Sequence, residues 1–327
     1  MRSIVVALLA ACGASEPSPK DLDPSWTLLM QDEPAALLSV WGTGPDDMWV
    51  AGGRSVIDGA PTVLHDRDGW TRVDAGVPGG DLWAVFGFEG GDVLFAGANG
   101  TIVRYRDGAF TPMATPRTGT IFGLWGTGPD DVWAVGDGGT AGAIVWHYDG
   151  ASWTEPALPA DVARTVFKVH GQRADDVWMS CADGSALHWN GSVIERELTG
   201  VTAPLFSIVT TPQSVVVAGG FPGEGMIVER TTQWASPVPA VPARWRGLAA
   251  GEGETVYVVG EGGLVAKRAQ GAWAIVDQRL TQENFHAAWV DEVGGLWAVG
   301  GDFDRVPLTA RGVFTYFGTD SISEVQP

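Results

Sequence analysis

Cysteine, tyrosine and histidine are scarce in this sequence, which holds two, four and five of them among its 327 residues. It contains no CxxC or HExxH motif, and no two histidines have the spacing of metal ligands. It also lacks a GxSxG elbow and a glycine loop leading into a helix, the arrangements that activate a serine or hold a phosphate. The sequence therefore predicts no metal centre, no cofactor and no common type of nucleophilic catalysis.

Basic residues are scarce as well, because 20 Lys and Arg stand against 39 Asp and Glu, for a formal net charge of −19. A surface this acidic repels the phosphates of nucleic acids and anionic lipid head groups. We therefore exclude nucleic acid as a partner, and we expect contact with a membrane only through an attached lipid.

Long apolar runs are missing, and the longest near the N-terminus, residues 4–11, is too short to span a bilayer. The segment Leu9-Ala10-Ala11-Cys12 resembles the bacterial lipobox, in which small residues precede a cysteine that is lipidated and becomes the new N-terminus. This resemblance implies a signal peptide over residues 1–11 and a lipid anchor on Cys12. The alternative is an ordinary signal peptide in which this cysteine is incidental.

The residues after the lipobox fit a tether. Residues 12–24 are small, polar and rich in proline, as a flexible linker to an anchor would be. Gly13 stands where an Asp would retain a Gram-negative lipoprotein at the inner membrane, so the resemblance implies the outer membrane. If Cys12 carries lipid, Cys181 has no cysteine left to pair with, and its place in a predicted strand predicts a buried, inert thiol.

Glycine, in contrast, is abundant, and it separates the segments of an internal repeat. The segment WGTGPDD occurs at residues 41–47 and again, unchanged, at 125–131. Extending the pattern gives seven apolar segments that each begin a unit of about 41 residues: 37–42, 82–87, 121–126, 166–171, 205–210, 245–250 and 285–290. Each is followed by a second and a third strand-like segment and, in most units, by a short fourth. Four short strands per unit, joined by Gly, Asn and Asp turns, are typical of a propeller blade.

The sequence thus predicts an all-β fold, a β-propeller of seven four-stranded blades, with six or eight as alternatives because the last units are degenerate. Paired glycines after the second strands, such as Gly52-Gly53, and the aromatic pair Tyr148 and Trp153 resemble the kelch-like and related bacterial propellers. That resemblance implies a fold and no activity. We expect the propeller over residues 25–320 and a tail over 321–327. Residues 25–30 are expected to close the ring on the last blade, and residues 311–317 compete for that role.

Several residue types recur at equivalent places in the repeat. Four second strands carry a tryptophan at the same position, which predicts that these side chains pack between the blades: Trp49, Trp133, Trp178 and Trp297. Paired aspartates between first and second strands predict a solvated acidic ring on one face, with weak Ca²⁺ binding as the alternative: Asp46/Asp47, Asp130/Asp131 and Asp175/Asp176. We expect the five histidines to be ordinary core or surface residues and not metal ligands.

Arginines recur in the loops that enter the first strands, on the opposite face: Arg117, Arg164, Arg244 and Arg279. Together with Lys168 and His286 they are the candidate ligand-binding residues, for an anion or an acidic glycan. Ordinary surface salt bridges are the alternative for the arginines. A sialidase-like activity is disfavoured because the four tyrosines are predicted on strands away from the axis.

These features favour binding over catalysis. The leading hypothesis is a monomeric cell-envelope lipoprotein that binds or scaffolds a protein or glycan through one face of the disc. The alternative is a propeller hydrolase or lyase acting on an extracellular polymer, which needs an acid–base cluster at the axial mouth. A purely structural envelope protein is a third possibility. Clustering of Arg117, Arg164, Lys168, Arg279 and His286 would favour the enzyme, and dispersal would favour binding.

Overall fold

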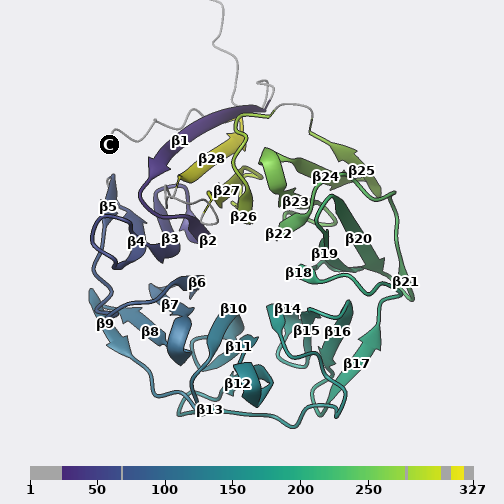
Figure 1. Cartoon of the computed structure of the whole chain (residues 1–327), viewed down its shortest axis with the longest axis horizontal. Helices are drawn as coiled ribbons and strands as arrows, with labels where there is room; N and C mark the ends of the chain where they lie inside the picture. The colour runs from purple at the N-terminus through teal and green to yellow at the C-terminus, as the bar shows by residue number, and fades with distance from the viewer. Residues whose placement is uncertain (1–23, 68, 277–278, 303–310, 320–327) are drawn as a thin grey trace, which may run out of the picture.

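The computed structural model describes residues 24–67, 69–276, 279–302 and 311–319. Within them, seven four-stranded antiparallel sheets stand around a central axis as the blades of a propeller (Figure 1). The predicted fold and the predicted number of blades are confirmed. The predicted signal peptide, the C-terminal tail and Cys12 lie outside the described residues, as does the tether up to residue 23.

In each of the first six blades, four consecutive strands run outward from the axis. The first two blades are β2 (Leu37–Gly44), β3 (Asp47–Arg54), β4 (Pro61–Asp66) and β5 (Trp70–Arg72), then β6 (Leu82–Phe88), β7 (Asp92–Gly97), β8 (Ile102–Arg106) and β9 (Ala109–Pro112). The next two are β10 (Thr120–Gly128), β11 (Asp131–Asp137), β12 (Ala143–Tyr148) and β13 (Trp153–Thr154), then β14 (Val166–Arg173), β15 (Asp176–Cys181), β16 (Ser185–Trp189) and β17 (Ile194–Leu198).

The fifth and sixth blades are β18 (Leu205–Thr210), β19 (Val215–Phe221), β20 (Glu224–Arg230) and β21 (Trp234–Ala235), then β22 (Trp245–Ala250), β23 (Val256–Gly260), β24 (Val265–Ala269) and β25 (Ala272–Ile275). Short 3₁₀ turns join second to third strands in three blades: η2 (Ala98–Gly100), η3 (Gly139–Ala141) and η4 (Glu261–Gly263). All seven inner strands begin within one residue of the segments expected from the repeat.

The seventh blade closes the ring with strands from both ends of the chain. Its inner three strands are β26 (Phe285–Val290), β27 (Leu296–Gly300) and β28 (Gly312–Gly318), and its outermost strand is β1 (Ser25–Glu33). β1 pairs antiparallel with β28, with Trp26 opposite Phe317. The predicted closure by residues 25–30 is therefore confirmed, and residues 311–317 supply the third strand instead of competing for the fourth place.

The core lies between the blades, where the second strands are covered on both sides. The indoles of Trp49, Trp133, Trp178 and Trp297 are at most 3% exposed. Each removes roughly 200 Å² from water, on the order of 5 kcal/mol before entropy is counted. These tryptophans therefore stabilise blade packing, as predicted. Cys181 in β15 is fully buried, and burial raises the pKa of its thiol to about 12, which makes it inert.

Candidate functional site

The same irregularity occurs near the start of every inner strand. Its pairing with the second strand skips one residue, so that seven equivalent bulges surround the axis. A bulged residue leaves the hydrogen-bond ladder and re-aims its side chain. The seven skipped residues are Leu38, Trp83, Phe122, Phe167, Phe206, Arg246 and His286.

Four of these bulged residues form an aromatic arc, which we define as Trp83, Phe122, Phe167 and Phe206. Consecutive ring centroids lie 5.2, 5.8 and 5.0 Å apart. Since blades diverge outward, equivalent side chains of successive blades can touch one another only near the axis. All four side chains keep part of their surface exposed. The arc therefore presents an aromatic surface at the axial mouth, on the face where the inner strands begin.

Arg246 continues the arc into the sixth blade. Its guanidinium carbon lies 5.6 Å from the ring centroid of Phe206, a cation–π distance. Its Nη2 is 3.1 Å from Oε1 of Glu261, which holds the side chain in place. The axial mouth thus combines an aromatic surface with an arginine that is paired to Glu261.

Lys168 reaches into the axis from the next position of the fourth inner strand. Its Nζ donates to the carbonyl oxygen of Phe122 at 2.6 Å and lies 3.4 Å from that of Trp83. Both carbonyls belong to residues of the aromatic arc. The ammonium group therefore lies beside the backbone of the two preceding blades, next to the residues of the arc.

An axial cavity of about 120 Å³ lies below the mouth. Lys168, His170 and His286 line it with serine, glycine and aliphatic residues, and its described lining includes no Asp or Glu. Burial lowers the pKa of Lys168 to about 8. Burial, and then the charges of Arg246 and Lys168, lower the pKa of His286 to about 4, and burial alone lowers that of His170 to about 4. At neutral pH both imidazoles are uncharged.

The four predicted arginines lie in loops on this face but do not converge on the cavity. Arg117 Nε donates to Oε1 of Glu155 at 2.7 Å, and Arg164 Nε donates to the carbonyl of Gly139 at 2.8 Å. Arg244 pairs with Glu261, and Arg279 is exposed beside η4. Of the candidate ligand-binding residues, the structure brings together Lys168 and His286, whereas three of the arginines bridge loops.

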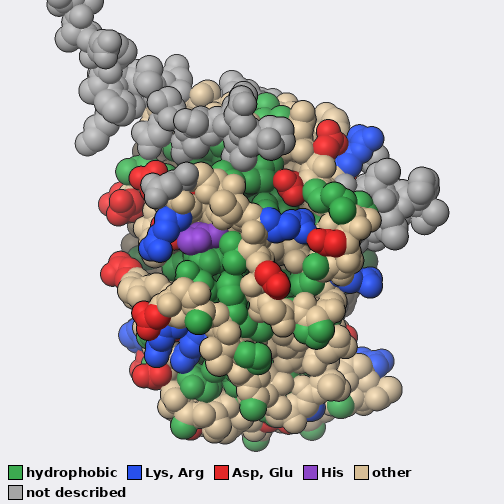
Figure 2. Space-filling model, turned by 90° about the vertical axis from the view of Figure 1, so that its left-hand side faces the viewer, with side chains coloured by type: hydrophobic (Ala, Val, Ile, Leu, Met, Phe, Trp, Pro, Cys, Tyr) green, Lys and Arg blue, Asp and Glu red, His purple; other side chains and the backbone are tan. Residues whose placement is uncertain are grey.

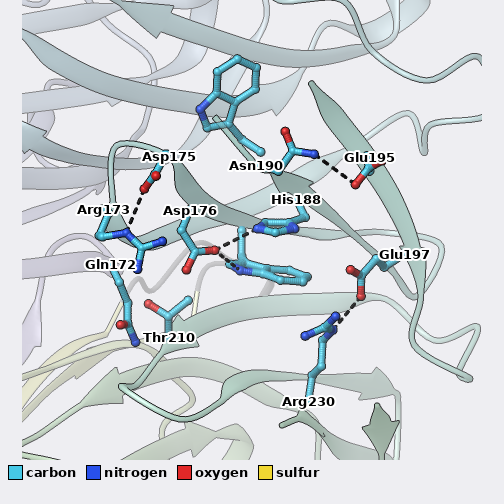
Figure 3. Close-up of polar contacts among 12 residues, drawn as sticks. Gln172, Arg173, Asp175, Asp176, His188, Asn190, Glu195, Glu197, Thr210 and Arg230 are labelled. Carbon is cyan, nitrogen blue, oxygen red and sulfur yellow. Dashed lines mark hydrogen bonds and ion pairs between the residues drawn. The ribbon is translucent and has the colours of Figure 1, made fainter. Parts of the chain in front are cut away.

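A second hollow, of about 260 Å³, lies between the fourth and fifth blades on the opposite face. Here Asp176 accepts a hydrogen bond from Nε2 of His188 at 2.9 Å, and His188 stacks on Trp178 at 3.9 Å. Figure 3 shows this pair between the ion pairs of Arg173 with Asp175 and of Arg230 with Glu197.

The His188–Asp176 pair resembles a catalytic dyad, but the repeat shows that it belongs to the scaffold. The same arrangement occurs in two other blades, as His65 with Asp47 over Trp49 and His147 with Asp131 over Trp133. The second Asp of each predicted pair is thus engaged inside its blade, and only the first members, Asp46, Asp130 and Asp175, are exposed. The acidic ring expected from the sequence is thus solvated at its first aspartates, whereas its second aspartates are only partly exposed and bind the histidines of their own blades.

Over the described part of the chain, no group of three His, Cys, Asp or Glu side chains is placed to hold a metal ion, and no helix is long and apolar enough to cross a membrane. On the edge of the disc shown in Figure 2, acidic and basic side chains are scattered among apolar and uncharged ones. The axial mouth differs from this mixed surface because it joins aromatic and basic side chains.

The aromatic arc and Arg246 are not among the binding residues predicted from the sequence. The signal was available, because aligning the seven inner segments places Leu38, Trp83, Phe122, Phe167, Phe206, Arg246 and His286 in one column. Strand alternation alone does not reveal that this column faces the axis, since a bulge changes the direction of its residue.

No family model matches the sequence, and no curated protein matches it. Solved structures do match it. The structure of YCF48 bound to D1 peptide is 16% identical, with a TM-score of 0.67 over 96% of this chain and 99% of that one. The WD40 repeats of RRP9 are 11% identical, with a TM-score of 0.71 over 90% and 97%. A streptogramin B lyase is 14% identical, with a TM-score of 0.67 over 90% and 97%. At these identities the likeness shows a shared propeller fold.

Proposed function

We propose that this chain is a binding propeller that holds a segment of a partner protein over the aromatic arc. The observation that carries the proposal is the arc itself, with four partly exposed aromatic side chains in contact around the axis and Arg246 beside them. Exposed apolar patches on soluble proteins mark interaction sites, and aromatic and arginine side chains dominate the energetics of such sites. A propeller of the same fold, YCF48, has been solved with a bound peptide.

The proposal includes export and tethering, because the lipobox-like segment ends in Cys12. The propeller would then act as a monomer at the outer membrane, where it scaffolds or captures an envelope protein. Mass spectrometry of the full-length chain, purified from a bacterial host that lipidates proteins, tests this part. We expect cleavage before Cys12 and added acyl mass on it, both lost in Cys12→Ser. An unmodified N-terminus would contradict the tether and leave the binding face unaffected.

Selection from a random peptide library tests the binding proposal. The full-length chain is immobilised, and retained peptides are compared with those retained by a Trp83→Ala/Phe167→Ala double variant. Because removing aromatic hot-spot residues costs about 2 kcal/mol or more, we expect affinity to fall by about 30-fold or more. Ile275→Ser is the matched control, since Ile275 is exposed on an outermost strand.

Two outcomes would contradict a peptide-binding arc: no peptide is enriched, or the double variant retains the same peptides as the wild type. A glycan array run in parallel covers the other class of partner expected for an envelope propeller. Glycan retention that the double variant loses would assign the arc to carbohydrate.

An enzymatic function is the second candidate, because Lys168 and His286 line the same cavity. Such an enzyme would be a hydrolase or lyase acting on an extracellular polymer. However, Nε2 of His286 donates to the carbonyl oxygen of Gly301 at 2.7 Å, and burial lowers the pKa of this imidazole to about 4, which makes it a weak base. Turnover of envelope polysaccharide by the wild type but not by Lys168→Met would favour this candidate over binding.

A further inference from the structure

A lysine occupies a position of the propeller where the repeat otherwise has only small side chains. The residue that directly follows the bulge of the inner strand is small in the other six blades: Ser39, Ala84, Gly123, Ser207, Gly247 and Ala287. Neighbouring inner strands approach closely here, since a Cβ added to Gly247 would lie 2.9 Å from the Cα of Ala287. In the fourth blade the residue is Lys168, whose side chain leaves this crowded layer and enters the axial cavity.

The packing of the blades does not require a lysine at this position. A small residue satisfies the packing in six blades, and burying a charged group opposes folding unless the group is paired. Lys168 has no carboxylate among the described lining residues of its cavity. An uncompensated charge at an exception to the repeat indicates a function outside the fold.

The ammonium group keeps hydrogen-bonding capacity. Nζ has three donors, and its two acceptors are the carbonyls of Phe122 at 2.6 Å and Trp83 at 3.4 Å. At least one N–H is therefore not committed to these carbonyls. Both carbonyls belong to the backbone of arc residues, so a ligand at this N–H would lie next to the positions from which the aromatic side chains project.

Arg246 offers a second basic group at the rim. Over the described residues its Nε is buried and makes no hydrogen bond, although its Nη2 is held by Glu261. His286 lines the cavity between these charges and is neutral at pH 7 because its pKa is lowered to about 4. The described lining of the cavity thus carries one cationic side chain, Lys168, and Arg246 adds a second basic group at the rim, where it is paired with Glu261. Because no Asp or Glu is among those lining residues, the cavity favours an anion over a cation.

The size of the cavity limits what enters it. Pockets for whole drug-sized ligands measure about 300–1,000 Å³, whereas this cavity measures about 120 Å³. It accommodates a few water molecules, each taking about 30 Å³ in the liquid, or one end group of a larger ligand. The rest of such a ligand would lie outside, over the arc.

We propose that the axial cavity binds a carboxylate of the partner, with Lys168 and Arg246 as the charged donors and the aromatic arc covering the apolar group next to it. The identity of the partner rests on the proposed function, whereas the carboxylate site can be tested without it. A C-terminal carboxylate and a Glu or Asp side chain present the same chemistry, and peptide variants distinguish them.

The test uses phenylpropionate, which joins an aromatic ring to a carboxylate, and phenylpropanamide, its neutral isostere. Calorimetry on the full-length chain is expected to show at least about tenfold tighter binding of the carboxylate, because hydrogen bonds to charged groups contribute about 1.5–3 kcal/mol. Lys168→Met and Arg246→Gln are each expected to reduce this preference. Lys267→Met, which removes a lysine from β24 outside the cavity, is expected to retain it.

Equal binding of the two probes, no binding of either, or an unchanged preference in Lys168→Met would overturn the carboxylate site. Unfolding midpoints of both cavity variants verify that they fold. Peptides from the library are then compared with a free or amidated C-terminus and with Glu or Gln inside. If peptides are enriched but phenylpropionate and phenylpropanamide bind equally, only the carboxylate site is rejected. If phenylpropionate binds more tightly but no peptide is enriched, only the peptide partner is rejected.

Discussion

Replacing Lys168 by methionine is expected to change how the stability of the propeller depends on pH. Burial lowers the pKa of Lys168 from 10.5 in the unfolded chain to about 8 in the folded one. Between these values the unfolded chain holds a proton that the folded chain has released. Unfolding therefore takes up a proton in this window, so the stability of the wild type rises as pH rises through it.

The magnitude follows from the two pKa values. A difference of one pKa unit corresponds to 1.36 kcal/mol, so lowering the pKa from 10.5 to about 8 corresponds to about 3 kcal/mol. Methionine has a similar volume and no charge, which keeps the packing change small. We expect the free energy of unfolding of the wild type, minus that of Lys168→Met, to rise by about 3 kcal/mol from about pH 7.5 to about pH 10.5.

Urea unfolding followed by tryptophan fluorescence at several pH values measures this difference. Groups common to both proteins cancel, and Lys267→Met controls for the loss of a lysine elsewhere. A wild-type-minus-variant difference that stays constant over the pH range would refute the burial argument for Lys168.

Other predictions concern the blades and the ring closure. Asp131→Ala should lower the free energy of unfolding, measured by chemical denaturation, by about 1–2 kcal/mol, because His147 loses its hydrogen-bond acceptor. The control Asp130→Ala removes an exposed carboxylate and should change this free energy by less than about 0.5 kcal/mol. Equal effects of the two substitutions would contradict a scaffold role for the His147–Asp131 pair. Leu29→Ala in β1 should lower the free energy of unfolding by about 2–5 kcal/mol, because Leu29 is buried. The control Gln31→Ala, at an exposed residue of the same strand, should leave this free energy almost unchanged. Equal stability of the two variants would show that β1 is not needed to close the ring. In NMR titrations His170 and His286 should protonate near pH 4, because burial lowers their pKa. The free energy of unfolding should fall as pH drops from 6.5 toward 4, since the unfolded chain binds these protons at a higher pH than the folded chain does. A titration midpoint near 6.5 would contradict the burial of these rings. Mass spectrometry should find Cys181 modified by thiol reagents only after unfolding, because burial raises its pKa to about 12.

The fold was predictable because a propeller repeats one local pattern. Each blade needs apolar strands at fixed spacing and turns that tolerate glycine, and these requirements are written in every unit of about 41 residues. The WGTGPDD copies set the period, and the period located all seven inner strands. The closure by β1 was expected from the sequence, but residues 311–317 competed for the same place, and the structure assigns the fourth strand to β1 and the third to β28.

The candidate site was predictable only in part. Lys168 and His286 were among the candidates, but the arginines were grouped with them from loop position alone. Whether a loop arginine points to the axis or to a neighbouring loop depends on partners far along the chain, such as Glu155 for Arg117, 38 residues away. A long side chain at the end of a loop binds whichever acceptor the neighbouring blades bring within its reach.

The sequence by itself determined the propeller fold, the inner strand of each unit and the tryptophans between the blades, since these depend on local periodicity, and it favoured seven blades over six or eight. The tertiary structure alone brought Trp83, Phe122, Phe167 and Phe206 into contact and placed Lys168 beside them. The physical reason is ring closure combined with the bulges: seven equivalent positions, each about 41 residues apart, meet only when the blades surround one axis.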